Sequence, residues 1–150
     1  VIYNVKALEG NTYNIVTETK EISKDDAANV KIDVNIIALL ASGSIDHGKM
    51  VFKKCAACHS VSKGGDNKIG PAFWRIIGRK AGSASDYKYS KALASYGKEW
   101  GWEEMNGFLT KPSKWIKGNK MGFAGLKKEK DRASVILYLN QNGDNPKSLP

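Results

Sequence analysis

Apolar residues recur at helical spacing from Ser44 onward, and the alternation typical of strands is almost absent there. The pattern predicts a first helix that begins near Ile45 or Asp46 and runs through His59. A second helix over residues 102–109 ends before Pro112, since the residue before a proline disfavours helix. A terminal helix over 129–139 places Val135 and Leu139 on one face. An all-α domain is therefore expected.

Two stretches of this region are predicted to be loops. Residues 60–82 hold five glycines and Pro71, which interrupt regular structure. Residues 119–125 follow no period and include Met121 between a lysine and a glycine.

The first 42 residues have a different composition, which is rich in Asn, Thr, Glu and Asp. Tyrosine and aliphatic residues alternate with polar ones over 3–5 and again over 13–15, which predicts a small hairpin or an extended arm. Residues 23–28 are polar and acidic, as in a linker.

A short helix is expected between this linker and Leu40. Asp33 is its predicted N-cap, and Ile36, Ile37 and Leu40 are expected on one face. We therefore divide the chain into an arm or linker over 1–42 and a folded domain over 43–150.

Length and charge narrow the class of protein. A chain of 150 residues with 41% hydrophobic residues is long enough to bury one core. Lysine and arginine number 24 against 15 acidic residues, so the surface suits an acidic partner. The basic residues are scattered and no nucleic-acid module signature accompanies them, so we expect no nucleic-acid partner.

No membrane or export segment is evident in the sequence. The apolar runs 36–41 and 135–139 are shorter than the ~20 residues that span a bilayer. The chain begins at Val1 and lacks a basic start followed by an apolar block. An anchor or signal removed upstream is compatible with this start.

The two cysteines stand in the run Cys55-Ala56-Ala57-Cys58-His59, the attachment motif of haem c. Helical positions i and i+3 share a face, so both thiols can reach the two vinyl groups on one porphyrin edge. His59 can then offer its imidazole to the iron from below the ring.

Three other interpretations of the cysteine pair compete with haem attachment. A disulfide would close a very short loop and constrain the unfolded chain little. A thioredoxin-like pair needs a strand-turn-helix setting that the sequence lacks. A structural zinc site needs further ligands, and the other histidine is His47.

Four side chains are candidates for the second axial ligand: Met50, Met105, Met121 and His47. His47 precedes His59 by ~18 Å along a common helix, so it cannot reach the opposite face of the ring. Met50 and Met105 fall in helical stretches, where methionine commonly fills the core. Met121 lies in a loop and is favoured, because a thioether there would stabilise the ferrous state.

The region from Gly48 to Leu139 resembles class I cytochrome c of the mitochondrial and alphaproteobacterial type. After the haem motif the resemblance is carried by Gly70-Pro71, Gly78-Arg79, Tyr89-Ser90, Trp100, Pro112, Gly118 to Met121 and Phe123-Ala124-Gly125. It implies helices and loops wrapped around one haem c, covalently bound through Cys55 and Cys58. The preceding arm is most similar to the segment that joins the haem domain of bacterial anchored forms to the membrane.

The resemblance also implies roles for single residues. Met121 is the expected distal ligand, and the Pro71 carbonyl accepts the free N–H of His59. Arg79, Tyr89 and Trp100 surround the haem propionates, although Trp74, Trp102 and Trp115 offer other indoles. Phe52 and Tyr138 pack where the first and last helices cross.

Some positions depart from the family pattern, and other positions match it. Phe108 stands where a tyrosine is usual, Leu93 where an asparagine is common, Asn119 in place of threonine and Lys117 in place of proline. The lysines that match positions around the exposed haem edge are Lys54, Lys68, Lys114, Lys120, Lys127 and Lys128.

The function implied is a monomeric electron carrier that shuttles one electron at a time from a quinol-oxidising complex to a terminal oxidase. Expected partners are an acidic cytochrome c oxidase and a quinol:cytochrome c reductase. The bacterial periplasm is the expected compartment, with an intermembrane space as the alternative. Other functions are a haem peroxidase or gas sensor, which would need an open sixth position, and a haem module of a larger oxidoreductase.

Overall fold

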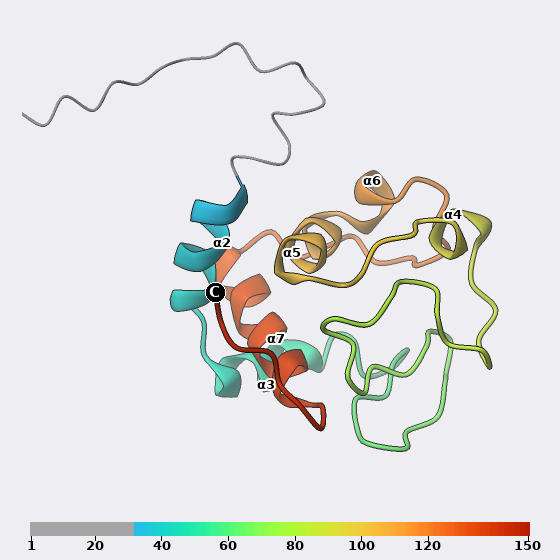
Figure 1. Ribbon diagram of the computed structural model, residues 1–150, viewed down its shortest axis with the longest axis horizontal. Coiled ribbons are helices and arrows are strands. Elements are labelled where there is room, and N and C mark those ends of the chain that lie inside the picture. Colours follow the sequence, from blue (N-terminus) through green and yellow to red (C-terminus); the bar gives the residue numbers. More distant parts are fainter. Residues whose placement is uncertain (1–31) are drawn as a thin grey trace, which may run out of the picture.

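The computed structural model describes residues 32–150, and their regular structure is helical (Figure 1). The helices are α2 (Ile32–Ala41), α3 (Ile45–Phe52), α4 (Lys91–Ala94), α5 (Trp102–Thr110), α6 (Pro112–Trp115) and α7 (Glu129–Gln141). Within this range there is no strand, only an isolated bridge between Lys80 and Glu99. The all-α expectation is confirmed, and residues 60–82 and 119–125 are loops as predicted.

Helices α3 and α7 cross at very close range. A Cβ on Gly48 would lie 2.0 Å from the carbonyl oxygen of Ser134, so only glycine fits there. The backbone N–H of Ser44 donates to Ser134 Oγ at 3.1 Å. The rings of Phe52 and Tyr138 meet at 5.5 Å between centroids, which confirms their predicted packing.

The chain that follows α3 differs from the prediction. The helix ends at Phe52 instead of continuing to His59, and residues 53–58 form successive turns. Cys58 N–H donates to the carbonyl of Cys55 at 3.0 Å, and His59 N–H donates to the same carbonyl at 2.9 Å. One of these hydrogen bonds spans three residues and the other spans four. The two cysteines therefore stay one turn apart, although the segment is not a regular helix.

Helices α4 and α6 were not predicted from the sequence because each is a single turn. Ser90 Oγ caps α4 by accepting from the N–H of Leu93 at 3.2 Å. Pro112 occupies the first turn of α6, where its missing N–H costs nothing. Four residues are too few to show a helical period.

Helix α2 belongs to the packed core. It begins at Ile32, so Asp33 lies inside the helix and is not its N-cap. Ile36, Leu39 and Leu40 are buried in the core, whereas Ile37 is 50% exposed and does not share their face. The core therefore begins before residue 43, because the apolar face of α2 packs on α7 and α5.

The predicted hairpin over 3–15 and the linker over 23–28 lie outside the described residues. In the part of the chain that is described, no helix combines the length and apolar character required to cross a bilayer. The arm was predicted over 1–42, and its part over 1–31 stays a prediction.

A polar contact on the surface also joins α3 to α7. His47 Nε2 lies 2.7 Å from Asp131 Oδ1, and both side chains are partly exposed. The hydrogen bond from His47 is the main cause that lowers the pKa of Asp131 below its ordinary value. His47 is thus engaged with α7.

We predict that Leu40→Ala lowers the free energy of unfolding by about 2–5 kcal/mol, since it leaves a cavity beneath α2. Ile37→Ala is the matched control on the same helix. Because Ile37 is half exposed, its truncation should cost less than about 1 kcal/mol. Urea unfolding of the two variants measures the difference, and equal costs would mean that α2 does not pack on the core.

A second prediction concerns pH. Because pairing lowers the pKa of Asp131, the stability it adds is complete above the ordinary value of 3.8 and is lost as pH falls through the lower folded-state pKa. Asp131→Asn should therefore cost about 0.2–1 kcal/mol at neutral pH, and this cost should shrink as the pH falls below 3.8. Urea unfolding at neutral pH and at several acidic pH values checks this; a cost that does not change with pH would contradict the pairing.

Candidate functional site

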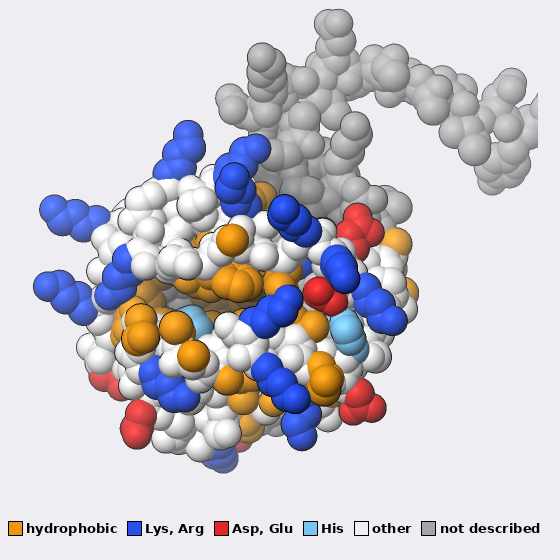
Figure 2. Space-filling view, turned by 180° about the vertical axis from the view of Figure 1, so that it is seen from behind, with side chains coloured by type: hydrophobic (Ala, Val, Ile, Leu, Met, Phe, Trp, Pro, Cys, Tyr) orange, Lys and Arg blue, Asp and Glu red, His pale blue; other side chains and the backbone are white. Residues whose placement is uncertain are grey.

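A large cavity opens between the loop that follows α3 and helices α5 and α7. Its volume is about 610 Å³, within the range of cofactor sites. Figure 2 shows a hollow floored by hydrophobic side chains, with lysine and arginine side chains gathered on the same face. The structure brings all eight predicted site residues to the cavity wall: Cys55, Cys58, His59, Pro71, Arg79, Tyr89, Trp100 and Met121.

Both cysteines are free thiols on one wall of the cavity, and no disulfide joins them. Burial, with a smaller contribution from Cys58, raises the pKa of the Cys55 thiol to about 11. Such a thiol is protonated at neutral pH, whereas redox-active pairs keep a low-pKa thiolate. A thioredoxin-like role for the pair is therefore disfavoured.

His59 is buried and held on two sides. Its Nδ1 lies 2.8 Å from the carbonyl oxygen of Pro71, and its ring stacks on Phe73 with 3.9 Å between centroids. A Cβ on Gly70 would lie 2.1 Å from His59 Cε1, so glycine leaves room for the ring. The predicted hydrogen bond between His59 and Pro71 is thus present.

The environment of His59 determines its protonation state. Burial lowers the pKa of His59 and outweighs the opposing effect of the Pro71 carbonyl, so the ring is neutral at pH 7. The carbonyl oxygen can only accept, so Nδ1 carries the proton and donates. Nε2 then keeps its lone pair, as a metal ligand requires.

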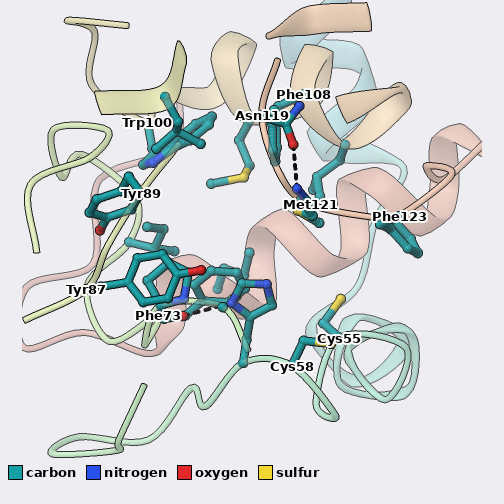
Figure 3. A pocket seen from close by; sticks show the side chains of 18 of the residues that line it. Cys55, Cys58, Phe73, Tyr87, Tyr89, Trp100, Phe108, Asn119, Met121 and Phe123 are labelled. Carbon is teal, nitrogen blue, oxygen red and sulfur yellow. Dashed lines mark hydrogen bonds between the residues drawn. The ribbon is translucent and has the colours of Figure 1, made fainter. Parts of the chain in front are cut away.

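The candidates for a second axial ligand are reduced to two. His47 and Met50 do not line the cavity, and Met50 is 59% exposed on α3. Met105 lines it from α5, where its side chain is buried, and Met121 lines it from the loop that follows α6. Figure 3 shows Met121 on the cavity wall beside Phe108 and Asn119.

The wall opposite the cysteines is aromatic and polar. Figure 3 places Trp100 and Tyr89 across the cavity from Cys55 and Cys58. All four tryptophans lie in the described range, and Trp100 is the one that lines this cavity. Tyr89 Oη accepts from the N–H of Ala84 at 3.2 Å, so its own O–H can still donate.

Arg79 holds the loop that carries Pro71. Its guanidinium donates to the carbonyl oxygens of Ala72 at 2.7 Å and Trp74 at 3.1 Å. Burial lowers the pKa of Arg79, but an arginine stays charged at neutral pH.

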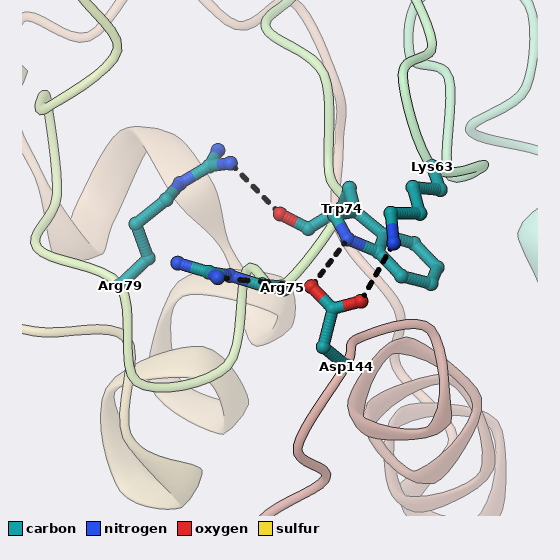
Figure 4. A network of polar contacts seen from close by, with 5 residues as sticks. All are labelled: Lys63, Trp74, Arg75, Arg79 and Asp144. Atoms are coloured by element: carbon teal, nitrogen blue, oxygen red, sulfur yellow. Dashed lines mark hydrogen bonds and ion pairs between the residues drawn. The ribbon is translucent and has the colours of Figure 1, made fainter.

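The same loop is fastened from outside by Asp144, which follows α7 (Figure 4). Asp144 accepts from Lys63 Nζ at 3.0 Å and from Trp74 Nε1 at 3.4 Å, and it pairs with Arg75 at 3.7 Å. These bonds lower the pKa of Asp144.

Tyr87 and Asn119 are among the cavity side chains that were not assigned a role from the sequence. Tyr87 Oη donates to the carbonyl of Ile69 at 2.7 Å, and Lys120 Nζ lies 4.6 Å from the centre of the Tyr87 ring. Asn119 appeared only as a departure from the family pattern, yet its Oδ1 accepts from the N–H of Met121 at 2.9 Å. Nothing in the sequence indicates these partners, because they depend on how the loops fold.

The residues of this cavity fit a haem. The thiols of Cys55 and Cys58 stand on one wall, a neutral imidazole and a thioether can ligate iron, and the rest of the lining is mainly apolar. Cationic and hydroxyl donors on the far wall suit buried carboxylates.

Comparisons with known proteins agree with this chemistry. Residues 45–143 match the family model described as cytochrome c. A cytochrome c homolog of Rickettsia typhi is 41% identical over 127 residues, which cover 85% of this chain and 73% of that protein.

Shorter proteins match as well. A cytochrome c of Gibberella zeae is 46% identical over 104 residues, 69% of this chain and 98% of that protein. A cytochrome c2 of Agrobacterium tumefaciens is 43% identical over 100 residues, 65% of this chain and 90% of that protein. The chain therefore belongs to the cytochrome c family, whose members carry electrons on a haem attached through a cysteine pair spaced like Cys55 and Cys58.

Proposed function

We propose that this cytochrome shuttles single electrons in a respiratory chain, from a quinol-oxidising complex to a terminal oxidase. The observation that carries the proposal is the presence of His59 and Met121 on the wall of one cavity. Two protein ligands fill both axial positions, so no position is left for a substrate. When bound, the haem takes up and releases one electron, and the protein sets how readily it does so.

The proposed axial ligands are His59 and Met121. His59 is neutral, buried and oriented by Pro71, which fixes the ring and raises its basicity as a ligand. Met121 is preferred over Met105 because Met105 is 5% exposed among the core residues of α5. A methionine on a loop can adjust its position to the iron without moving a helix.

The proposed propionate partners are Arg79, Tyr89 and Trp100. Arg79 uses two N–H groups on backbone carbonyls and has others to spare. The Tyr89 hydroxyl and the Trp100 indole can each donate one hydrogen bond. Buried carboxylates need such donors, because desolvation is otherwise costly.

Redox partners are proposed to dock at the mouth of the cavity. Lys54, Lys80 and Lys120 line the cavity and are exposed, and the chain carries a formal charge of +9. Acidic partner surfaces would be attracted at long range, which raises encounter rates. Lys120 also has a structural contact, since its Nζ donates to the carbonyl of Lys88. Lys54 is therefore the cleaner probe of docking.

The proposed compartment is the bacterial periplasm, with the arm leading to a membrane tether upstream of Val1. A relative from Bradyrhizobium diazoefficiens, named cytochrome c homolog, is 36% identical over 136 residues and includes part of the arm region in its match. A truncated protein that tests whether the haem site needs the arm should begin at Ile32, so that α2 is kept.

A peroxidase or gas sensor is less well supported. Such a protein needs a labile sixth position and a distal acid-base group. Both histidines lie in the described range; His59 is the proposed proximal ligand, and His47 pairs with Asp131 away from the cavity.

The ligand set is tested by Met121→Ala in the ferric holoprotein. We expect loss of the near-infrared methionine–iron band, a high-spin haem and a markedly lower reduction potential, since a thioether favours the ferrous state. Met105→Ala is the matched control and should keep the band. If Met105→Ala removes the band and Met121→Ala keeps it, the assignment must be reversed.

Docking is tested by the rate of electron transfer to an acidic oxidase as ionic strength rises. We expect the rate constant to fall, because charges are screened over ~8 Å at physiological salt. Lys54→Glu should be slower than wild type at low salt. Lys49→Glu changes the net charge equally but lies away from the cavity lining, and it should be less affected. A rate constant that does not change with ionic strength would contradict electrostatic docking.

A further inference from the structure

The segment that carries Met121 has little support from its own backbone. Gly118 and Gly125 have φ values of 87° and 111°, and Gly122 adds a third flexible position. In the described chain, no backbone group from 120 to 125 bonds to another backbone group. Side chains must therefore hold Met121 in place.

Asn119 provides this hold with a single carboxamide. Its Nδ2 donates to the carbonyl oxygens of Pro112 at 2.8 Å and Ile116 at 2.7 Å. Its Oδ1 accepts from the N–H of Met121 at 2.9 Å (Figure 3). One side chain thus connects Met121 to both ends of α6.

Helix α6 is itself packed tightly against α5. Pro112 is fully buried, and the indole of Trp115 packs against Gly107 of α5 so closely that a Cβ there would lie 2.4 Å away. The Trp115 Nε1–H also donates to Glu104 Oε2 of α5 at 3.1 Å. The position of Met121 is thereby tied to α5.

The chemistry of the carboxamide suits this task. It offers two N–H donors and an acceptor oxygen in one plane, whereas a threonine hydroxyl offers a single donor. Asn119 is only partly exposed, so solvent replaces these bonds poorly. The Asn119 carboxamide therefore restrains the loop through three hydrogen bonds.

Lys120 supplies a second restraint from the surface. Its Nζ donates to the Lys88 carbonyl and lies over the Tyr87 ring. Because Lys120 is exposed, water competes for these contacts, and their loss should matter less.

We propose that Asn119 is a positioning residue that keeps Met121 on the iron and so closes the sixth position to small external ligands. This inference rests on the proposed function, in which Met121 is the distal ligand. An external base such as imidazole can bind only when Met121 has left. The affinity for imidazole therefore reports how strongly the loop is held.

The experiment is an imidazole titration of the ferric holoprotein, followed by visible absorbance. Asn119→Ala should bind imidazole about tenfold more tightly than wild type, since one net hydrogen bond is worth about that factor. Asn119→Asp keeps an acceptor for the Met121 N–H but loses both donors, so it should also bind more tightly. Lys120→Ala should show a smaller increase.

Asn140→Ala is the matched control. Asn140 is also a partly exposed asparagine, and it too uses both ends of its carboxamide: Nδ2 donates to the carbonyl of Lys147 and Oδ1 accepts from the N–H of Lys147, both at 2.9 Å. It does not line the cavity, and neither bond involves the Met121 loop. This variant should keep the wild-type imidazole affinity. An equal gain in Asn140→Ala would attribute the effect to general destabilisation and overturn the inference.

The two proposals fail in different ways. If Met121→Ala loses the near-infrared band but Asn119→Ala binds imidazole as wild type does, the ligand assignment stands and the role of Asn119 is wrong. If Met121→Ala keeps the band, the distal ligand itself is misassigned and the inference falls with it.

Discussion

The close crossing of α3 and α7 is the contact on which the site depends. Gly48 lies against the Ser134 carbonyl with no space for a side chain, and the N–H of Ser44 bonds to Ser134 Oγ. This crossing fixes the end of α3, and the turns that follow it carry both cysteines and His59 to the cavity wall. A larger residue at position 48 would separate the helices and displace the whole proximal side.

The rest of the site consists of loops that are fastened to this frame by side-chain and carbonyl contacts. The Pro71 carbonyl orients His59, and Arg79 and Asp144 brace the loop that holds Pro71. Burial keeps the histidine neutral and the Cys55 thiol protonated. These protonation states suit ligation and attachment of a haem more than acid-base catalysis, in agreement with the family's role in carrying electrons.

Much of this structure follows from the sequence, because its strongest signals are local. The haem motif, the helix over 129–139 and the loop around Met121 are each indicated by residues close in the chain. The end of α3, the packing of α2 and the one-turn helices α4 and α6 were missed or misplaced. Helices α4 and α6 are too short to show a helical period. The packing of α2 depends on distant residues, since Leu40 is buried on a helix that packs on α7 and α5. The restraint by Asn119 likewise required the fold of the loop around α6 to be known.

The most direct test of this account is to identify the methionine that binds the iron. The chain has three methionines, so selective ¹³C labelling of their methyl groups gives a small set of signals in the ferrous, diamagnetic holoprotein. A methyl group held above the ring is shifted strongly upfield by the porphyrin ring current. The account predicts one such signal, which disappears in Met121→Ala and persists in Met105→Ala. A spectrum without an upfield methyl signal, or one whose signal disappears with Met105, would contradict it.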